Sequence, residues 1–326
     1  MIRPFLPAVD YPALAELLSA EGPATVTVPE LRERDAALPD ADELSTDQRG
    51  RLTGHGRVRL VQPGLHGDLL AFATAWRAPW TPPGDLASLV VSAPGRAPAW
   101  LLPLYDGLEQ WARGAGASRL LGELPDGLGE SGHTHGTCPA DLTGLLLGRG
   151  YRVDAHVRSA VAALGPDLPA PQPPPGLHLD TLATTTAAEP ERQLHRLYRE
   201  TLRDNPGFAD ALPGFEAWRA EALGGPDGRL DWVFTAEYAG RIVGVTVAHT
   251  LPDPRACRVD YTGVLRQWRG RGLARALKLH AARRLVEHGV RTAHTEVEAG
   301  NARMVAVNKA LGYRWGAGHR RLVKEF

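Results

Sequence analysis

The chain has 326 residues, in which 37 lysines and arginines balance 37 aspartates and glutamates. This balance argues against nucleic acid or an anionic membrane as a partner, because proteins that bind them carry a basic field. With 43% hydrophobic and 23% charged residues, the composition is that of a globular protein rather than a disordered, fibrous or disulfide-stapled one.

The cellular compartment is predicted from the cysteines and the amino-terminal residues. Two cysteines, Cys138 and Cys257, cannot build a disulfide framework, which favours a reducing cytoplasm. Residues 1–19 are broken by prolines and carry acidic residues, unlike a signal peptide, and no apolar stretch is long enough to span a membrane. Many arginines, few lysines and abundant Ala, Gly and Pro are typical of a GC-rich, bacterial genome.

A proline-rich segment divides the chain. Residues 165–176 contain six prolines, which fix φ and remove backbone donors, so we expect a semi-rigid, extended linker. The linker separates a first domain, residues 1–164, from a second, residues 177–326, and each is of ordinary domain size.

The two halves share a sequence pattern. Pairs that recur at one constant spacing are Val91 and Val264, Leu104 and Leu277, Gly116 and Gly289, and Glu123 and Glu296. After this block the register changes, so that Gly150-Tyr151-Arg152 matches Gly312-Tyr313-Arg314, which indicates an insertion in the first half within residues 125–136. Several matches in fixed register predict a duplicated domain.

The second half shows the clearer pattern of elements. Strands are predicted at 232–238, 242–249, 257–264 and 292–297, and helices at 272–288 and 301–311. The turn residues Ala239-Gly240 predict an antiparallel hairpin, and the strand, helix, strand order predicts a right-handed crossover. The expected product is a mixed sheet with helices on both faces.

A glycine-spaced loop links the third of these strands to its helix. Gly270 and Gly272 let the backbone pass close to a ligand, and the helix start adds the positive end of its dipole. Arg269 and Arg271 add positive charge. The loop therefore predicts a cradle for a diphosphate.

The following helix supplies a second motif. It runs from Asn301 through Met304 and Asn308 to Gly312, which stops it, and Tyr313 follows. The ordered set of strand, R-x-x-G-x-A loop, helix, strand and N-x-x-M-x-x-x-N-x-x-L-G-Y helix resembles the GNAT superfamily of N-acetyltransferases. The resemblance covers most of residues 177–326.

The resemblance implies a fold of the α/β (α+β) class. We expect two tandem GNAT-like domains, each a mixed, mainly antiparallel sheet flanked by helices, with a splayed central strand pair. It also implies acetyl-coenzyme A as co-substrate, whose pantetheine arm would bind Val264 and Leu265 where their strand splays from 292–297. The residues that it implies for the diphosphate are Arg269, Gly270, Arg271, Gly272, Leu273 and Ala274.

The first half resembles the same family, but its loop differs. Ala97, Pro98 and Ala99 stand where the second half has Gly270, Arg271 and Gly272, so one N–H donor and both flexible positions are lost. We predict that this half holds no coenzyme A and instead completes the fold and walls the substrate cleft.

The implied chemistry is the attack of a neutral amine on a thioester. An alkyl amine has a pKa of about 10.4, so freeing it at pH 7 costs roughly 4 to 5 kcal/mol unless a base helps. Asp260 and Glu296 lie on the two splayed strands, and either could accept the proton directly or through a water. We favour Asp260, because Glu296 has a counterpart, Glu123, in the degenerate half; the alternative is a salt-bridged Asp260.

The general acid is less clear in the sequence. Many family members place a tyrosine where this chain has Asn308, which cannot donate an acidic proton. Either Tyr261 acts instead or water supplies the proton, and Asn308 could bind the pantetheine arm. Asn301, the other cofactor candidate, also fits a helix cap.

Two further features bear on ligands. Phe215 and Trp218 lie where the family builds a substrate lid, so they could contact the acceptor. His133, His135, Cys138 and Asp141 have the residue types of a metal site. A glycine-rich insert also exposes such residues when they bind no metal, and we expect no metal here.

The leading hypothesis is an acetyl-coenzyme A dependent N-acetyltransferase that modifies a small-molecule amine, as a monomer or homodimer. The acceptor could be a natural product, an antibiotic, an amino sugar or an amino acid. A mycothiol synthase ranks lower, because that family's acidic residue is Arg258 here. The sequence also fits a protein or peptide N-acetyltransferase, or a coenzyme A sensor that has lost catalysis.

Overall fold

The structure is a computed structural model that describes residues 2–21, 25–36, 43–78, 81–95, 97–125, 140–204, 214–224 and 229–326. It contains two compact units. The first is formed by Met1–Val157 with Ala317–Phe326, and the second is formed by Arg158–Gly316.

The first unit is built on a mainly antiparallel sheet. Its strands are β1 (Arg3–Pro4), β2 (Glu43–Thr46), β3 (Leu52–Pro63), β4 (Leu69–Arg77), β5 (Asp85–Ser92), β6 (Arg119–Pro125) and parts of β7 (Arg152–Ala163) and β13 (Arg314–Glu325). Its helices are α1 (Pro7–Glu21), α2 (Val28–Ala36), α3 (Leu102–Gly114) and α4 (Ala140–Gly148). The strand order is β1-β3-β4-β5-β6-β13-β7, with β2 paired to β3, and β5 and β6 run parallel.

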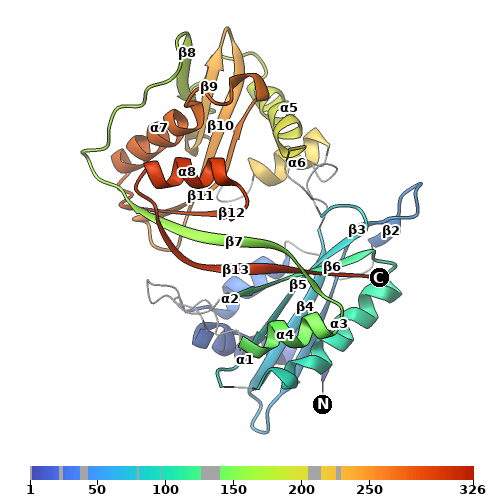
Figure 1. Cartoon of the computed structure of the whole chain (residues 1–326). Coiled ribbons are helices and arrows are strands. Elements are labelled where there is room, and N and C mark those ends of the chain that lie inside the picture. Colours follow the sequence, from blue (N-terminus) through green and yellow to red (C-terminus); the bar gives the residue numbers. More distant parts are fainter. Residues whose placement is uncertain are drawn as a thin grey trace. The chain divides into compact units, whose positions relative to one another are not determined.

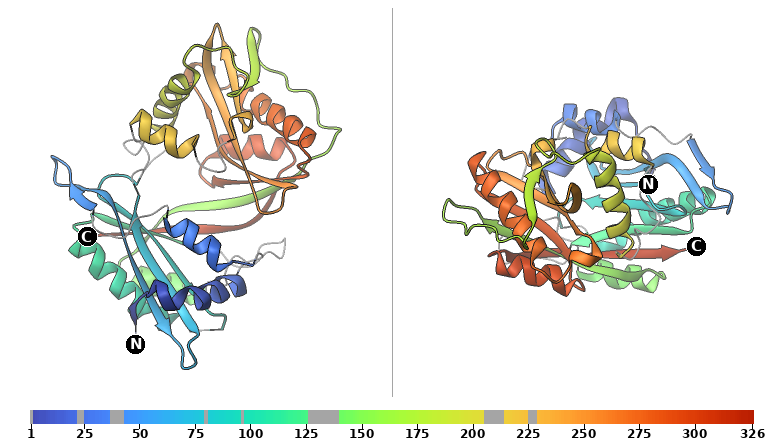
Figure 2. Two further views of the ribbon diagram at one scale, coloured as in Figure 1. Left: turned by 180° about the vertical axis from the view of Figure 1, so that it is seen from behind. Right: turned by 90° about the horizontal axis from the view of Figure 1, so that it is seen from above.

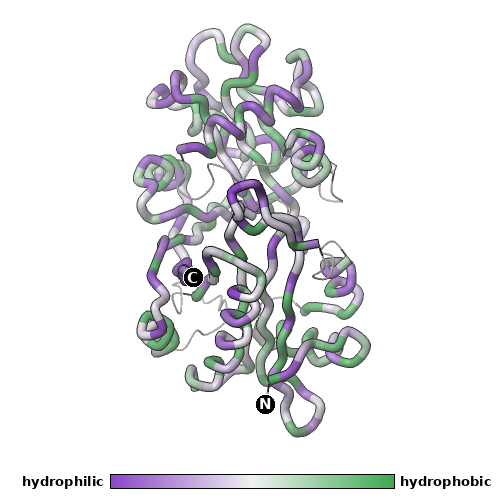
Figure 3. The backbone as a smooth tube through the Cα atoms, turned by 90° about the vertical axis from the view of Figure 1, so that its right-hand side faces the viewer, coloured by the Kyte–Doolittle hydropathy of each residue, from purple (hydrophilic) through white to green (hydrophobic). Residues whose placement is uncertain are grey.

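Helices cover both faces of this sheet (Figure 2, left). On one face α1 and α2 pack on Val61, Leu69 and Phe72. On the other, α3 and α4 bury Leu104, Leu108 and Leu146 against β5 and β6. Hydropathy alternates along the covering helices, as expected where one side of each faces a core (Figure 3).

The second unit repeats this plan. Its strands are β8 (Leu177–Thr181), β9 (Val233–Tyr238), β10 (Arg241–Thr250), β11 (Ala256–Val264) and β12 (Thr292–Glu298), with the end of β7 beside β12. Its helices are α5 (Pro190–Leu202), α6 (Phe215–Ala222), α7 (Leu273–Glu287) and α8 (Ala302–Ala310). The order is β7-β12-β11-β10-β9-β8, in which β11 and β12 run parallel and the pairs from β8 to β11 are antiparallel.

Helices α5 and α6 lie on one face of this second sheet, and α7 and α8 lie on the other (Figure 1). On one face α5 and α6 pack on Ile242, Val245 and Val247. On the other, α7 buries Leu277 and Leu285 against the strands. The mixed sheets with helices on both faces confirm the predicted fold class, and the antiparallel hairpin predicted at Ala239-Gly240 joins β9 to β10.

The unit boundaries fall inside two strands rather than at the proline-rich linker. Residues 317–325 of β13 belong to the first unit, where His319–Glu325 pair with β6, and residues 158–163 of β7 belong to the second. The boundaries expected from the sequence were 164 and 177. Linker composition marks where the chain is extended, whereas the units are the parts of the chain within which most tertiary contacts fall. None of the described helices is long and apolar enough to cross a membrane.

Candidate active site

The loop between β11 and α7 adopts the conformation that its glycines permit. Gly270 has φ 75° and Gly272 has φ 78°, in the left-handed region that favours glycine. A Cβ at either position would point into open space. The first helical hydrogen bond runs from the Ala276 amide to the Gly272 carbonyl at 3.0 Å, so the amides of residues 273–275 have no acceptor within α7. The loop therefore presents amides and a helix start to an anion.

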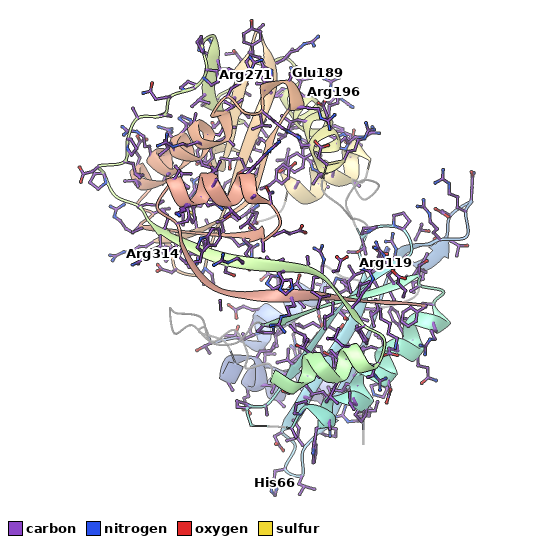
Figure 4. The ribbon with its side chains drawn as sticks, in the orientation of Figure 1. His66, Arg119, Glu189, Arg196, Arg271 and Arg314 are labelled. Atoms are coloured by element: carbon purple, nitrogen blue, oxygen red, sulfur yellow. The ribbon has the colours of Figure 1, made fainter. Side chains whose placement is uncertain are left out.

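Arginines surround the loop and also hold it in place. Arg269 donates through Nε to the Val264 carbonyl at 2.8 Å, and its Nη1 lies 2.5 Å from Oδ2 of Asp204. The hydrogen bond from Arg269 lowers the pKa of Asp204. Arg271, labelled in Figure 4, is exposed, and its guanidinium lies over the Trp268 ring at 5.2 Å. Arg269 thus anchors the loop, while Arg271 stays available to a ligand.

The central strands part just beside this loop. Parallel pairing of β11 with β12 runs from Ala256 and Thr292 to Val259 and Thr295 and stops there. The β10–β11 register shifts at the same place, because Val247 pairs with Tyr261 and Ala248 with Val259, which leaves Asp260 as a bulge. A bulge bends its strand and redirects the side chains that follow, so it accounts for the predicted splay.

The bulge also changes which face the side chains of β11 occupy. Cys257 and Val259, before it, belong to the core under α7, whereas Tyr261, after it, packs with the core under α5 and α6. In a regular strand without a bulge, the side chains of Cys257, Val259 and Tyr261 would all lie on one face. Asp260 is therefore the residue at which the side chains of β11 change from one face of the sheet to the other.

The two predicted carboxylates both act on the guanidinium of Arg258, Asp260 by direct contact and Glu296 through its charge. Asp260 accepts from Nε of Arg258 and from its Nη2 at 3.2 Å, and Nε2 of His249 lies 3.4 Å from Asp260 Oδ2. Glu296 accepts from Ser159 Oγ at 3.0 Å. The Asp260 hydrogen bond, together with the charges of both carboxylates, raises the pKa of Arg258. Asp260 is therefore salt-bridged to Arg258, as the alternative interpretation of the sequence expected.

His249 and Arg258 are members of this cluster that sequence reasoning did not identify as site residues. His249 of β10 and Arg258 of β11 are paired residues on these two neighbouring strands. The signal that could have found them is a histidine at the end of an otherwise apolar strand. Histidine is a common general acid or base in catalysis, so its place beside Asp260 is relevant to proton transfer.

Tyr261 lies on the other side of the bulge, among aromatic rings. Its hydroxyl is 2.5 Å from Thr201 Oγ1, its ring stacks on Tyr198 at 4.4 Å, and burial raises its pKa. Tyr198 also meets Trp218, at 5.5 Å, and Phe215 is 6.2 Å from Trp218. The two lid candidates are thus connected to Tyr261 through one aromatic cluster, in which Trp218 is almost fully buried.

The two asparagines of the second motif have different surroundings. Asn301 caps α8, because its Oδ1 accepts from the Met304 amide at 3.1 Å. Asn308 is completely buried, and its Oδ1 accepts from Nζ of Lys278 at 2.7 Å. Within the described part of the chain, its Nδ2 has no hydrogen-bond partner. Lys278 is a further buried polar residue that the sequence did not single out.

The main-chain groups predicted to bind pantetheine have internal partners in this structure. The Val264 carbonyl accepts from Arg269, and the Leu265 amide donates to the Val243 carbonyl at 3.0 Å. A carbonyl has two lone pairs, so Val264 keeps one for a second donor.

The corresponding loop of the first unit has another conformation. Pro98–Leu101 form a 3₁₀ turn in which the Trp100 amide donates to the Ala97 carbonyl at 3.0 Å and Pro98 offers no amide. Ala97 has an ordinary φ of −66°. The β4–β5 pairs also run from Ala71 and Ser92 to Trp76 and Ala87 in one register, without a bulge.

The histidine-rich insert lies outside the described residues. These are His133, His135 and Cys138, together with the side chain of Asp141. Among the residues that the structure does describe, no three His, Cys, Asp or Glu side chains are grouped to hold a metal ion.

Comparisons with known proteins agree with this geometry. Residues 192–313 match the family model Acetyltransferase (GNAT) family. The fold is similar to that of a GCN5-related N-acetyltransferase from Sphaerobacter thermophilus, with TM-score 0.73 and 20% identity, over 100% of this chain and 95% of that one. It is also similar to a tandem GNAT protein from the clavulanic acid biosynthesis pathway, with TM-score 0.66 and 18% identity, over 100% and 98%. No curated protein matches the chain in sequence.

Proposed function

Because residues 192–313 form a GNAT domain within a tandem GNAT fold, we propose that this protein is an acetyl-coenzyme A dependent N-acetyltransferase. Its second unit would be catalytic, and its acceptor would be a primary amine on a small molecule. The observation that carries the proposal is the loop at Gly270 and Gly272, whose positive φ angles open onto empty space at the start of α7.

Several residues of the second unit fit the parts of acetyl-coenzyme A. The amides of residues 273–275 and the exposed Arg271 would hold the diphosphate. The buried Nδ2 of Asn308 lacks an acceptor among the described residues, as a group that binds an amide carbonyl of the pantetheine arm would. Bound acetyl-coenzyme A supplies the activated acetyl group; the protein's own residues position it and manage protons.

The bulge cluster is suited to accepting the amine's proton. Asp260 and Glu296 are negative groups on splayed strands, and His249 lies beside Asp260. Asp260 can orient His249 or accept the proton through a water, while Arg258 limits how freely the carboxylate itself moves. Such a base would contribute roughly 10²- to 10⁴-fold to the rate.

The acceptor class is proposed from charge and architecture. Equal numbers of acidic and basic residues give no support for a nucleic acid or a histone-like tail as the acceptor. One structural relative is a tandem GNAT protein from the clavulanic acid biosynthesis pathway. These observations favour a small amine, such as a natural-product intermediate, an antibiotic, an amino sugar or an amino acid.

The test uses acetyl-coenzyme A with an isotopically labelled acetyl group and a mixed library of small amines. We expect a labelled amide product from the wild type and, at a limiting concentration of acetyl-coenzyme A, much less of it from Gly272→Ala. The matched control is Gly289→Ala, because Gly289 has φ 89° at the other end of α7 and its Cβ would also meet nothing. Product that forms equally with both variants would contradict the proposed site.

A second candidate is a coenzyme A binding protein without catalysis. The ion pair of Asp260 with Arg258 and the asparagine at position 308 favour it. An enzyme loses acetyl transfer in Asp260→Ala, whereas a sensor binds acetyl-coenzyme A in wild type and variant alike and turns over with neither.

A further inference from the structure

The second unit contains a buried lysine that has no carboxylate counter-ion among the residues that the structure describes. The Lys278 side chain is almost fully buried, its Nζ donates to Asn308 Oδ1, and it lies 5.0 Å from the centre of the Tyr313 ring. A charged lysine can donate hydrogen bonds but cannot accept them, so it orients the Asn308 amide with Oδ1 toward Nζ. Within the described residues, the two N–H donors of Nδ2 have no acceptor.

The groups that face Lys278 cannot neutralise it. Burial lowers the pKa of Lys278 to about 7. Cys257 of β11 and Tyr313 are the titratable groups around it, and burial raises the pKa of Cys257 to about 12 and that of Tyr313 as well. Both are therefore neutral near pH 7. Lys278 and the Asn308 amide together therefore form a partly cationic, buried group of hydrogen-bond donors. Among the described residues, no acceptor meets the Nδ2 donors, and no carboxylate pairs with Lys278.

The fold itself does not need this arrangement. In the repeat pattern Lys278, Asn308 and Tyr313 correspond to Tyr105, Leu146 and Tyr151 of the first unit. There the two tyrosine rings meet edge to face at 6.0 Å, and Leu146 is buried in the same core. A lysine also lies at this place in the first unit, because Nζ of Lys324 is 5.3 Å from the centre of the Tyr151 ring. It is paired there with the buried Glu109 at 3.0 Å, whereas Lys278 has no carboxylate partner among the described residues.

Lys278 also lies near the last paired residues of β11 and β12, beyond which the two strands part. It is in the second turn of α7, the helix that begins at the loop, and α7 and α8 cover the same face of β11 and β12 (Figure 1). Cys257, which faces it, pairs with Ala293, two residues before the last β11–β12 pair at Val259.

From this juxtaposition we infer that Lys278, oriented by Asn308, stabilises and protonates the thiolate of coenzyme A that leaves during acetyl transfer. The inference rests on the proposed function. When the thioester C–S bond breaks, its electron pair goes to sulfur, and a proton passes from Nζ to that sulfur. Lys278 regains a proton from solvent after the product leaves. A thiol with a pKa near 8.5 accepts this proton readily from a group that titrates near neutrality.

The first measurement follows Lys278 itself by NMR. The chain has only three lysines, Lys278, Lys309 and Lys324, so ¹³C-labelled side chains give few signals, which Lys278→Met and Lys309→Met assign. We expect one lysine to titrate near neutrality and its pKa to rise by about 1 to 3 units with bound coenzyme A, as an opposite charge within a few ångströms causes. Bound acetyl-coenzyme A, a neutral thioester, should raise it much less. Equal responses to the two ligands would overturn the inference.

The second measurement follows the ligand. The thiol pKa of bound coenzyme A, read from thiolate absorbance, should be at least about one unit lower in the wild type than in Lys278→Met. The control Lys309→Met removes an exposed neighbour and should leave it unchanged. The double variant Lys278→Tyr with Asn308→Leu carries the first unit's own residues, so it should fold and lose the shift.

These outcomes separate the inference from the proposed function. If coenzyme A binds wild type and Lys278→Met with the same thiol pKa, the role of Lys278 is refuted and the acetyltransferase proposal stands. If the wild type binds neither coenzyme A nor acetyl-coenzyme A, both fail.

Discussion

The two units share a strand, loop, helix and strand but differ at the positions that a thioester ligand would need. After β11 the chain turns through Gly270 and Gly272, whereas after β5 it forms a 3₁₀ turn at Pro98–Leu101. The strand of the second unit carries a bulge at Asp260, and that of the first keeps one register. Since the first unit folds without these features, folding does not explain them in the second.

A third difference lies in the core beneath the loop. The second unit buries Lys278 and Asn308 where the first buries Tyr105 and Leu146. The first unit places Lys324 beside Tyr151 and pairs it with Glu109, whereas Lys278 beside Tyr313 has no carboxylate partner among the described residues. A buried lysine without such a partner costs stability, which indicates a use in the second unit. Loop, bulge and buried lysine occur together in the second unit, and the first unit has a different structure at each of the three places.

The largest effect should come from the carboxylate that has no counterpart in the first unit. We expect Asp260→Ala to lower kcat by roughly 10²- to 10⁴-fold, the contribution of a general base or of the residue that orients it. Glu123→Ala, in the first unit, should leave kcat unchanged. Steady-state kinetics with the identified amine measures both, and an unchanged kcat in Asp260→Ala would remove this residue from the mechanism.

The next effect concerns stability and pH. Lys278 has a pKa of about 7 in the folded chain, against 10.5 when unfolded, so between these values unfolding takes up a proton. The free energy of unfolding should therefore rise with pH across this window, by on the order of 5 kcal/mol in total, and the cost of the buried charge is fully present below pH 7. Denaturant titrations should show this rise in wild type and Lys309→Met but not in Lys278→Met. Parallel pH curves for all three would contradict it.

Binding should be affected more moderately by the loop glycine. Gly272→Ala places a methyl group where the diphosphate is expected, and we predict acetyl-coenzyme A affinity about 10- to 100-fold weaker, the range for hydrogen bonds to a charged group. Gly289→Ala imposes similar backbone strain at the far end of α7. Calorimetry on both variants compares them, and equal losses of affinity would show that strain rather than contact is responsible.

The smallest effect is expected in the first unit. Ala97 has an ordinary φ, so Ala97→Gly only adds freedom to the unfolded chain and should cost about 0.4 to 1 kcal/mol. Thermal denaturation measures the cost, and acetyl-coenzyme A affinity should not change. Altered affinity would place part of the ligand site in the first unit.

Much of the second unit could be predicted from its sequence. The helix expected at 272–288 is α7, Leu273–Glu287, and the glycine-spaced loop before it has the predicted left-handed residues. These features depend on local signals, namely glycine spacing, apolar periodicity and a helix cap at Asn301.

Other features could not be predicted, because they depend on which distant residues meet. A bulge depends on register, so the sequence marks Asp260 as a strand residue but not as the extra one. The contact between Lys278 and Asn308 joins two helices, and a lysine in an amphipathic helix ordinarily reads as exposed. The unit boundaries inside β7 and β13 likewise depend on which distant residues are in contact rather than on linker composition.

The most direct test of the difference between the units is the stoichiometry of acetyl-coenzyme A binding to the full chain, measured by calorimetry or native mass spectrometry. The account predicts one equivalent in the wild type, weakened in Gly272→Ala and unaffected in Ala97→Gly. Two equivalents in the wild type, or one that persists unchanged in Gly272→Ala, would contradict a ligand site built only on the second unit.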